Sequence, residues 1–173
     1  GQTMSNWEMI IVDDCSTDGT QNLVKLAIAE DNRIILMENE KNIGQGLTRN
    51  RAIKAAQGRF IAFLDSDDVW TPNKLEVQLS AMESLGVALS HTAFGYINQT
   101  GEIIKSPLHV SKEPINYKDL LRRTEIGCLT VVYDTDIVGK MYMPDLPRSQ
   151  DYALWLSILK QGHKSLPIDE VLA

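Results

Sequence analysis

The sequence contains few cysteines and no long apolar segment. Its two cysteines, Cys15 and Cys128, lie far apart and form no CxxC pair. This argues against a disulfide scaffold and is typical of reduced thiols in a cytoplasmic protein. No apolar run approaches the roughly 20 residues needed to cross a bilayer. The first residues, GQTMSNWE, lack the basic start and apolar middle of a secretory signal.

Basic residues are also scarce. Lys and Arg number 17 against 23 Asp and Glu, which gives a formal net charge of −6, so a broad basic surface for nucleic acid is not expected. The three histidines show no metal-ligand spacing and are expected to be surface or structural residues. The remaining composition is ordinary. With 173 residues, 43% of them hydrophobic, the chain can form one domain with a real core.

Strand and helix patterns alternate through the first half of the chain. Short apolar runs rich in β-branched residues predict strands at 8–12, 33–37 and 59–64, and each is followed by a helical pattern. The third helix is expected to start at Thr71-Pro72, with Thr as its cap. This β-α-β-α-β-α order predicts an α/β fold with a mostly parallel sheet and helices on both faces.

The pattern changes after about residue 86. A small antiparallel element is expected there, followed by a short helix, a strand and a last helix that begins near Asp151. These elements are predicted at 87–97 with 102–105, at 117–123, at 127–133 and from 151 onward. We find no linker or repeat, so 1–173 is predicted to be a single domain. Both ends look truncated, because the first visible strand already ends in acids and the last residues, 171–173, are apolar.

Two apolar runs stop abruptly at clusters of acidic residues. Met9–Val12 is followed by the pair Asp13-Asp14, and Phe60–Leu64 by Asp65-Ser66-Asp67-Asp68. Open α/β sheets build ligand sites at the carboxyl ends of their strands. Neighbouring carboxylates repel one another unless a cation or a hydrogen-bonding ligand offsets the cost. The sequence therefore predicts a site for a divalent metal and an anionic, hydroxyl-rich small molecule.

The second acidic cluster is the candidate metal site. If the segment is extended, the side chains of Asp65 and Asp67 point the same way and can converge on one ligand. Mg²⁺ or Mn²⁺ prefers one or two carboxylates together with phosphate oxygens and water. A divalent cation bound to these carboxylates would hold a diphosphate, which the carboxylates alone would repel. The alternative is an acidic turn in which Asp68 caps the next helix.

Other polar residues allow two interpretations each. The pair Asp13-Asp14 could accept hydrogen bonds from a base or ribose, or Asp14 could accept the backbone N–H groups of Ser16 and Thr17 in a turn. Arg49 could bind a phosphate or base, or lie on a solvated helix face. Asp151 could be a general base, or a carboxylate stabilised by a helix dipole. Spacing alone leaves these alternatives open.

Three segments together resemble a known family. EMIIVDDCSTDGT, NIGQGLTRNRAIKAAQGRFIAFLDSDDVWTPNKL and RSQDYALWLSILKQG closely resemble the family 2 glycosyltransferases of the GT-A fold, from Trp7 to about Gly162. The resemblance implies inverting, metal-dependent transfer of a sugar from a nucleotide-sugar donor, most commonly a UDP-sugar. The acceptor would be the hydroxyl of a glycan or lipid-linked glycan. The resemblance would also place the full-length enzyme in the cytoplasm, at the inner face of the cell membrane, with peripheral membrane association.

The resemblance also assigns roles to residues. Asp14 matches the acid that contacts the donor base, supported by Asp13, and Arg49 matches the arginine of an ARN-like stretch. Asp65 matches the ribose-side acid of the DxD motif and Asp67 its metal ligand, Mn²⁺ or Mg²⁺. The residue that matches the catalytic base is Asp151. On this basis 1–86 would be the nucleotide-sugar-binding half and 87–173 the acceptor-side half.

Three features depart from the family pattern. Gln150 stands where a Glu usually precedes the base, and Cys15 stands where Gly is commoner, which is tolerable if the backbone φ angle there is negative. The first strand, with its donor loop, is missing. We expect the fragment to lack a complete donor site, which could leave it inactive.

Two other functions fit parts of the sequence. FIAFLDSDDV resembles the start of a haloacid dehalogenase-type phosphatase, with Asp65 as nucleophile and Asp67 as acid/base. That class carries its motif on the first strand, whereas here two strands precede it. The other alternative is a non-catalytic or degenerate domain that binds a nucleotide sugar. Product formation would separate an enzyme from a binding domain.

Overall fold

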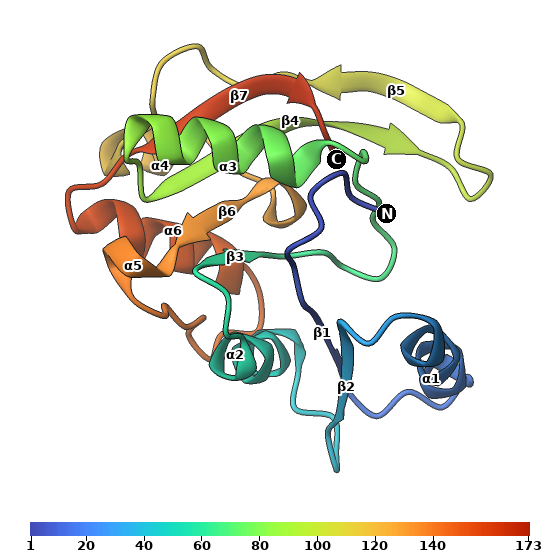
Figure 1. Ribbon diagram of the computed structural model, residues 1–173. Helices are drawn as coiled ribbons and strands as arrows, with labels where there is room; N and C mark the ends of the chain where they lie inside the picture. The colour runs from blue at the N-terminus through green and yellow to red at the C-terminus, as the bar shows by residue number, and fades with distance from the viewer. The chain divides into compact units, whose positions relative to one another are not determined.

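A computed structural model describes residues 1–173 (Figure 1), which divide into two compact units. The β1–β2 unit consists of 6–59 and 140–154. The β3–β7 unit consists of 1–5, 60–139 and 155–173. The units do not follow a boundary at residue 86, so the assignment of a donor half and an acceptor half remains a prediction. No helix combines the length and apolar character needed to cross a bilayer.

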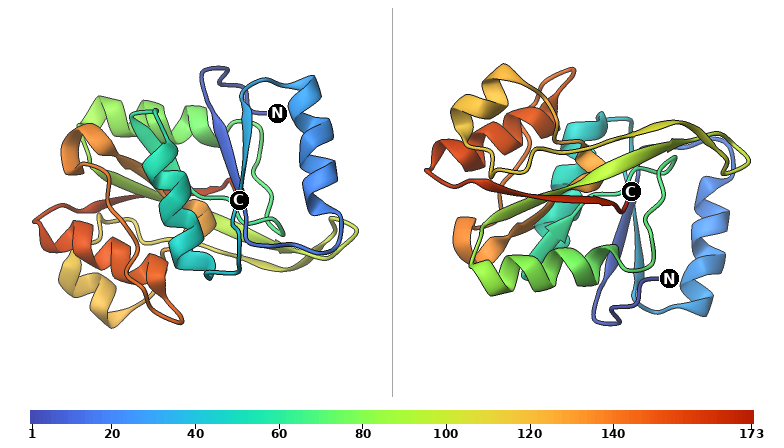
Figure 2. Two further views of the ribbon diagram at one scale, coloured as in Figure 1. Left: turned by 90° about the horizontal axis from the view of Figure 1, so that it is seen from below. Right: turned by 90° about the horizontal axis from the view of Figure 1, so that it is seen from above.

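The β1–β2 unit confirms the predicted start of the β-α-β-α order. Strand β1 (Met9–Asp13) pairs in parallel with β2 (Ile34–Glu38), and Asp13 lies opposite Glu38. Helices α1 (Thr20–Glu30) and α2 (Gln45–Ala55) flank this pair on opposite sides (Figures 1 and 2). Apolar runs at 9–12 and 34–37 favour the strands because their β-branched residues suit a pleated surface.

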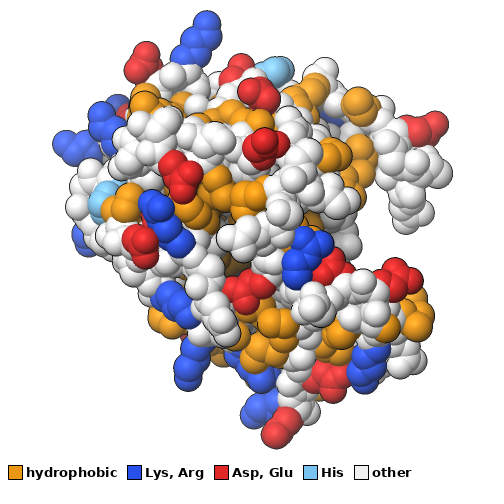
Figure 3. All heavy atoms as spheres, in the orientation of Figure 1, with side chains coloured by type: hydrophobic (Ala, Val, Ile, Leu, Met, Phe, Trp, Pro, Cys, Tyr) orange, Lys and Arg blue, Asp and Glu red, His pale blue; other side chains and the backbone are white.

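Helix α1 differs from the expected amphipathic pattern. The sequence places Leu23, Leu26 and Ala27 on one face, but Leu23 is 70% and Leu26 67% exposed. Val24, Ala27 and Ile28 are partly covered instead, and no residue of α1 is fully buried. Hydrophobic side chains accordingly reach the surface where α1 lies in Figure 3. Helical spacing identified the apolar residues of α1 but not which of them face the sheet.

The β3–β7 unit contains a mixed sheet in the order β3-β6-β4-β5, with β7 paired to β4. Parallel pairing joins β4 to β7, and the other pairs are antiparallel. The predicted hairpin is confirmed, since β4 and β5 are antiparallel neighbours. The strands are β3 (Phe60–Ala62), β4 (Leu89–Ile97), β5 (Ile103–Leu108), β6 (Val132–Asp134) and β7 (Ser165–Val171).

Most elements in the rest of the chain follow the sequence pattern, but two predicted strands need correction and the short helix at 135–138 was not predicted. The segment predicted as one strand at 127–133 forms a 3₁₀ turn before the short β6, and β3 is shorter than 59–64 and has the antiparallel β6 as its neighbour. The elements are α3 (Lys74–Leu85), α4 (Tyr117–Arg122), η1 (Cys128–Thr130), α5 (Thr135–Val138) and α6 (Gln150–Lys160). Helix α6 enters the β3–β7 unit at Trp155.

Helix α3 begins later than predicted. Its N-cap is Asn73 and its first residue Lys74, so Thr71 is not the cap and Pro72 is not the first helical residue. Thr71 makes other hydrogen bonds. Its backbone N–H donates to the Leu172 carbonyl over 2.9 Å, and its hydroxyl donates to Asn73 Oδ1 over 2.9 Å. A contact with a distant segment thus overrides a local start signal.

The face of α3 that packs against the sheet carries polar side chains. Lys74 and Gln78 are fully buried and hydrogen-bond to each other. Gln78 Nε2 also donates to Ser90 Oγ over 2.9 Å and to the Thr130 carbonyl over 3.0 Å. Burial lowers the pKa of Lys74 to about 7. These bonds satisfy the polar groups that burial would otherwise leave unpaired, and they join α3 to β4 and η1.

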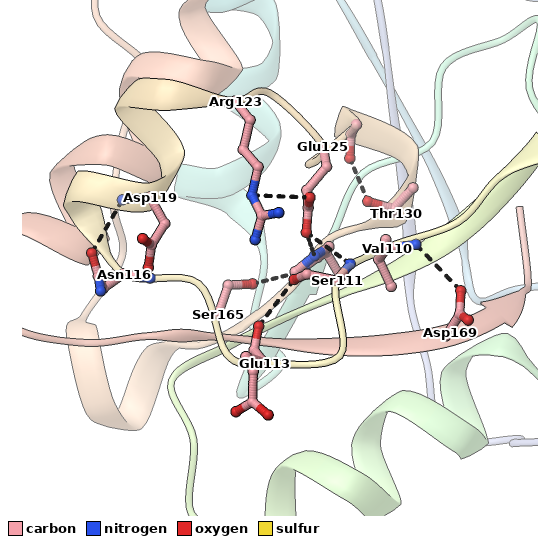
Figure 4. A network of polar contacts seen from close by, with 12 residues as sticks. Val110, Ser111, Glu113, Asn116, Asp119, Arg123, Glu125, Thr130, Ser165 and Asp169 are labelled. Atoms are coloured by element: carbon pink, nitrogen blue, oxygen red, sulfur yellow. Dashed lines mark hydrogen bonds and ion pairs between the residues drawn. The ribbon is translucent and has the colours of Figure 1, made fainter.

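A second polar network includes Ser111, Arg123, Glu125 and Ser165 (Figure 4). The buried His91 of β4 contacts two of these residues. His91 is fully buried, and its Nδ1 lies 2.7 Å from Ser165 Oγ. Its Nε2 lies 3.8 Å from Glu125 Oε1, which accepts the backbone N–H of Ser111. Arg123 Nε approaches Glu125 Oε2 at 3.4 Å. Burial lowers the pKa of His91 to about 4, although Glu125 acts in the opposite direction.

The buried His91 should make stability depend on pH. Its pKa is about 4 in the folded state against an ordinary value of 6.5, so the unfolded chain binds the extra proton between these values. The stabilisation is complete above pH 6.5 and is lost as the pH falls towards 4. Between pH 7 and 4.5 we expect a loss of roughly 2.5 kcal/mol in the free energy of unfolding from this group.

Urea unfolding at the two pH values measures this loss. The variant His91→Gln should lose less stability on acidification than the parent protein. The control His109→Gln, at an exposed histidine paired with Asp169, should behave like the parent. Equal losses in the parent and in His91→Gln would contradict the assignment.

Candidate functional site

Asp13 is the last residue of β1 and fixes the turn that follows. It is 5% exposed, and its Oδ2 accepts the backbone N–H of Ser16 over 3.1 Å and Gln21 Nε2 over 2.8 Å. The pKa of Asp13 is lowered, because hydrogen bonds from Ser16 and Gln21 to the ionised form outweigh burial. The turn-forming role considered for Asp14 therefore belongs, in part, to Asp13.

Asp14 has different partners from those of a simple turn. Its carboxylate accepts the backbone N–H groups of Ile43 and Gly44, both over 2.9 Å, and Asn39 Nδ2 over 2.6 Å. Burial by itself raises the pKa of Asp14, but these hydrogen bonds outweigh it and the pKa is lowered. An ionised Asp14 thus ties the end of β1 to the loop that precedes α2.

Cys15 adopts a left-handed conformation, with φ of 67°. The condition under which Cys would readily replace Gly here, a negative φ, is therefore not met. The chain reverses here while Asp13 and Asp14 are held by different partners, and Cys15 Sγ donates to the Asn39 carbonyl over 3.2 Å. A glycine would adopt this conformation without the steric cost that Cβ brings.

A cleft of about 380 Å³ lies beside the start of α2. The N-cap of this helix is Gly44, and no side chain caps its first turn. The positive end of the helix dipole favours negative charge at such a position. The cleft is lined on one side by residues at the start of α2 and on the other by the segment that precedes and begins α6: Ile43, Gly44, Gln45, Gly46, Leu47, Asp145, Leu146, Pro147 and Gln150.

Helix α2 also holds the returning segment 140–150. Asn50 Nδ2 donates to the Met143 carbonyl and Asn50 Oδ1 accepts the Met143 N–H, both over 2.7 Å. Lys140 Nζ donates to the carbonyls of Lys54 and Ala56. Within Thr48-Arg49-Asn50, only Arg49, which is half-buried on the same helix, was predicted to be a site residue. The role of Asn50 was not predicted, because no local pattern reveals a partner far along the chain.

Asp151 lies in the first turn of α6, directly after Ser149, which has a positive φ angle, and Gln150, which is buried. Ser149 has φ of 58°, and its carbonyl accepts the Ala153 N–H over 3.1 Å. Gln150 is 7% exposed and lines the cleft. Asp151 itself is half-buried. A half-buried carboxylate in the first turn of a helix is compatible with both a helix-dipole interaction and a role as a base.

The acidic segment after β3 is a turn rather than an extended chain. The Asp68 N–H donates to the Asp65 carbonyl over 3.1 Å, so the extended geometry expected for Asp65 and Asp67 was wrong. Asp68 does not cap α3, whose N-cap is Asn73. No group of three or more His, Cys, Asp or Glu side chains is arranged to hold a metal ion. Asp65 is half-buried and Asp67 exposed, a donor set that fits Mg²⁺ or Mn²⁺ completed by phosphate and water oxygens.

The predicted site residues are thus divided between the two units. Asp13, Asp14, Arg49 and Asp151 belong to the β1–β2 unit, and Asp65 and Asp67 belong to the β3–β7 unit. Within the first unit, Asp14 holds the loop at Ile43 and Gly44, which forms one wall of the cleft. Gln150, next to Asp151, forms part of the other wall.

An α/β fold with acidic residues after its strands and a cleft beside α2 is compatible with the GT-A class, and comparisons with known proteins agree. The family model described as Glycosyl transferase family 2 matches residues 1–139. The chain therefore belongs to glycosyl transferase family 2. It is 44% identical over 172 residues to "Putative teichuronic acid biosynthesis glycosyltransferase TuaG" of Bacillus subtilis (strain 168), covering 99% of this chain and 68% of that protein.

A second relative and two solved structures extend the comparison. The Escherichia coli protein named UDP-Glc:alpha-D-GlcNAc-diphosphoundecaprenol beta-1,3-glucosyltransferase WfgD is 42% identical over 95% of this chain and 62% of its own length. S. aureus TarS 1-349 in complex with UDP matches with a TM-score of 0.81 at 21% identity, covering 99% of this chain and 52% of that one. Mannosyltransferase PcManGT from Pyrobaculum calidifontis, in complex with GDP-Man and Mn²⁺, has a TM-score of 0.66 at 18% identity, covering 95% and 46%.

These comparisons confirm the predicted family and the GT-A fold. The chain spans 68% and 62% of the length of the two curated relatives, and about half the length of the two structural neighbours.

Proposed function

We propose that the full-length protein transfers a sugar from a nucleotide-sugar donor to a hydroxyl of a glycan or lipid-linked acceptor. The observation that supports this most directly is the cleft between the start of α2 and the start of α6. One wall is anchored to the acidic end of β1 through Asp14, and the other leads directly into Asp151. A phosphatase nucleophile on Asp65 would leave this arrangement without a role.

The donor is proposed to be a UDP-sugar. TarS is a structural neighbour in complex with UDP, and WfgD carries UDP-Glc in its name. Asp13 and Asp14 are proposed to shape the nucleotide side of the site, because they fix the turn after β1 and the loop before α2. Arg49 on α2 and Asp65 after β3 are proposed to contact the donor through its phosphate or base and its ribose.

Transfer is proposed to be a direct displacement with inversion at the anomeric carbon. The acceptor oxygen forms a bond to that carbon as the bond to the departing diphosphate breaks. Asp151 accepts the proton of the acceptor hydroxyl during the attack. Its place in the first turn of a helix stabilises the ionised carboxylate that a base requires.

A divalent cation, Mn²⁺ or Mg²⁺, is proposed as the cofactor. Asp67 would hold it, with Asp65 close by in the same turn, and the remaining ligands would be phosphate and water oxygens. When bound, the ion supplies positive charge that offsets the charge on the departing diphosphate. The neighbour PcManGT, solved in complex with GDP-Man and Mn²⁺, supports the choice of metal.

The acceptor is proposed to be a growing surface glycan on a lipid carrier. The name of WfgD specifies such an acceptor, a GlcNAc-diphosphoundecaprenol, and that of TuaG specifies teichuronic acid biosynthesis. An enzyme with a lipid-linked acceptor must meet it at a membrane surface. We therefore propose that the full-length protein works on the cytoplasmic face of the membrane as a peripheral protein.

A donor screen of the full-length protein tests the function. The protein is incubated with a panel of nucleotide sugars and a GlcNAc-diphospholipid, with Mn²⁺ or with a chelator, and the glycolipid product is identified by mass spectrometry. We expect one or two UDP-sugars to yield a disaccharide-lipid, and only when metal is present. Donor binding without product for any acceptor would favour the non-catalytic alternative, and phosphate release from a generic phosphoester would favour the phosphatase.

A further inference from the structure

Gln150 immediately precedes the proposed base and makes contacts in two directions. We propose that Gln150 is a positioning residue, which clamps the segment 145–149 against α2 and so fixes the place of Asp151 beside the cleft. This proposal rests on the proposed function of Asp151 for its effect on activity. Whether Gln150 holds the segment 145–149 against α2 can be tested without substrate.

The first contact is a hydrogen bond within the loop before α6. Gln150 Nε2 donates to the Leu146 carbonyl over 2.8 Å, and the Gln150 side chain is 7% exposed. The bond closes the loop 146–150 on itself. An ionised carboxylate could not make it, because a carboxylate only accepts hydrogen bonds and would face the carbonyl oxygen. This hydrogen bond therefore depends on the amide, and an ionised Glu at the same position could not form it.

The second contact is close packing against the first turn of α2. A Cβ added at Gly46 would lie 2.9 Å from Gln150 Cγ and 3.4 Å from Gln150 Cβ. Gly46 is not in a left-handed conformation, so its lack of a side chain serves the close approach of Gln150 rather than a turn. The glutamine stem thus rests directly on the helix whose N-terminal end Asp14 anchors.

The backbone between the loop and Asp151 needs such support. Ser149 is a non-glycine residue with φ of 58°, a conformation that persists only where the surrounding structure holds it. Gln150 follows directly and is held through both its amide and its stem. A displacement of about 1 Å at a catalytic group can cost roughly 100-fold in rate. If Gln150 no longer held this backbone, we expect Asp151 to shift and the rate of transfer to fall.

Two substitutions of Gln150 in the full-length protein test the role of its amide independently of its aliphatic stem. Gln150→Met keeps the length but removes the donor, so kcat should fall about 10- to 100-fold at every pH, with donor KM changed little. Gln150→Glu can donate only while the introduced carboxyl is protonated. Its kcat should therefore approach that of the parent near pH 5 and fall progressively below it as the pH rises. A parental kcat in Gln150→Met, or a parental pH profile in Gln150→Glu, would overturn the proposal.

Gly46→Ala tests the second contact. It should lower kcat in the parent background, and the loss should be smaller in the Gln150→Ala background, where no γ atom remains to clash with the added Cβ. Additive losses would count against the clamp. Gln161→Met is the matched control, because Gln161 Nε2 lies 3.5 Å from the Ser157 carbonyl at the other end of α6. It should leave kcat unchanged.

Amide hydrogen exchange without substrate distinguishes the two proposals. Gln150→Met should lose protection in a peptide covering 145–154, whereas Gln161→Met should not. If the parent protein transfers no sugar, this loss of protection would still support the clamp while the proposed function fails. Unchanged exchange in Gln150→Met would refute the clamp even in an active enzyme.

Discussion

Replacing Asp151 with Asn in the full-length protein is expected to lower kcat for sugar transfer by about 10²- to 10⁴-fold, the usual contribution of a positioned general base. The carboxamide has nearly the same shape as the carboxylate but cannot accept the acceptor proton. Donor affinity should change little, since the donor contacts are proposed to come from other residues. Steady-state kinetics of glycolipid formation and calorimetry with the donor measure the two effects.

The control for this prediction is Glu76→Gln. Glu76 also lies in the first turn of a helix, α3, so its substitution removes a favourable dipole interaction without touching the proposed base. It should retain parental kcat. A transfer rate in Asp151→Asn within a factor of about two of the parent would remove Asp151 from the mechanism, because a general base contributes far more than that.

Replacing Asp67 with Ala is expected to abolish metal-dependent transfer. Asp67 is exposed in the turn after β3, so the substitution removes a carboxylate without opening a cavity in the core. The apparent affinity for Mn²⁺ in the presence of donor should fall, because the cation would keep only phosphate, water and any contact with Asp65. A titration of initial rate against Mn²⁺ concentration measures this loss.

Ser66→Ala is the matched control for Asp67. It changes an exposed residue of the same turn without removing a charge, and its Mn²⁺ titration should overlay that of the parent. An unchanged Mn²⁺ dependence in Asp67→Ala would show that the metal, if used, is held elsewhere. Loss of activity in both variants would instead indicate that the conformation of the turn, rather than the Asp67 carboxylate, is essential.

Local patterns predicted the elements of the fold well where residues interact with near neighbours. The runs at 9–12 and 34–37 form β1 and β2, and the helix expected near Asp151 is α6. Predictions failed where a distant segment competes for the same groups. Thr71 bonds to Leu172 and leaves the cap of α3 to Asn73, and the segment expected as one strand at 127–133 turns at η1 before it pairs.

The candidate site shows the same difference between local signals, which can be predicted from the sequence, and contacts between distant residues, which cannot. The acids after β1 and β3 and the acid at the start of α6 were identified from the sequence, since an apolar run ending in carboxylates is a local signal. Their hydrogen-bond partners were not. A turn with Ser16 and Thr17 was one of the two alternatives for Asp14, but its carboxylate binds Ile43 and Gly44, which lie 29 and 30 residues away. Asn50 binds Met143 across 93 residues.

The sequence by itself determined most of the strands and helices, the family and the acidic residues that follow the strands, because periodicity and short motifs are properties of neighbouring residues. Only the tertiary structure decided that Asp14 anchors the start of α2, that Asn50 holds the returning chain and that Gln150 rests on Gly46. These contacts depend on which distant segments fold against each other, and packing and hydrogen-bond satisfaction over the whole unit select them.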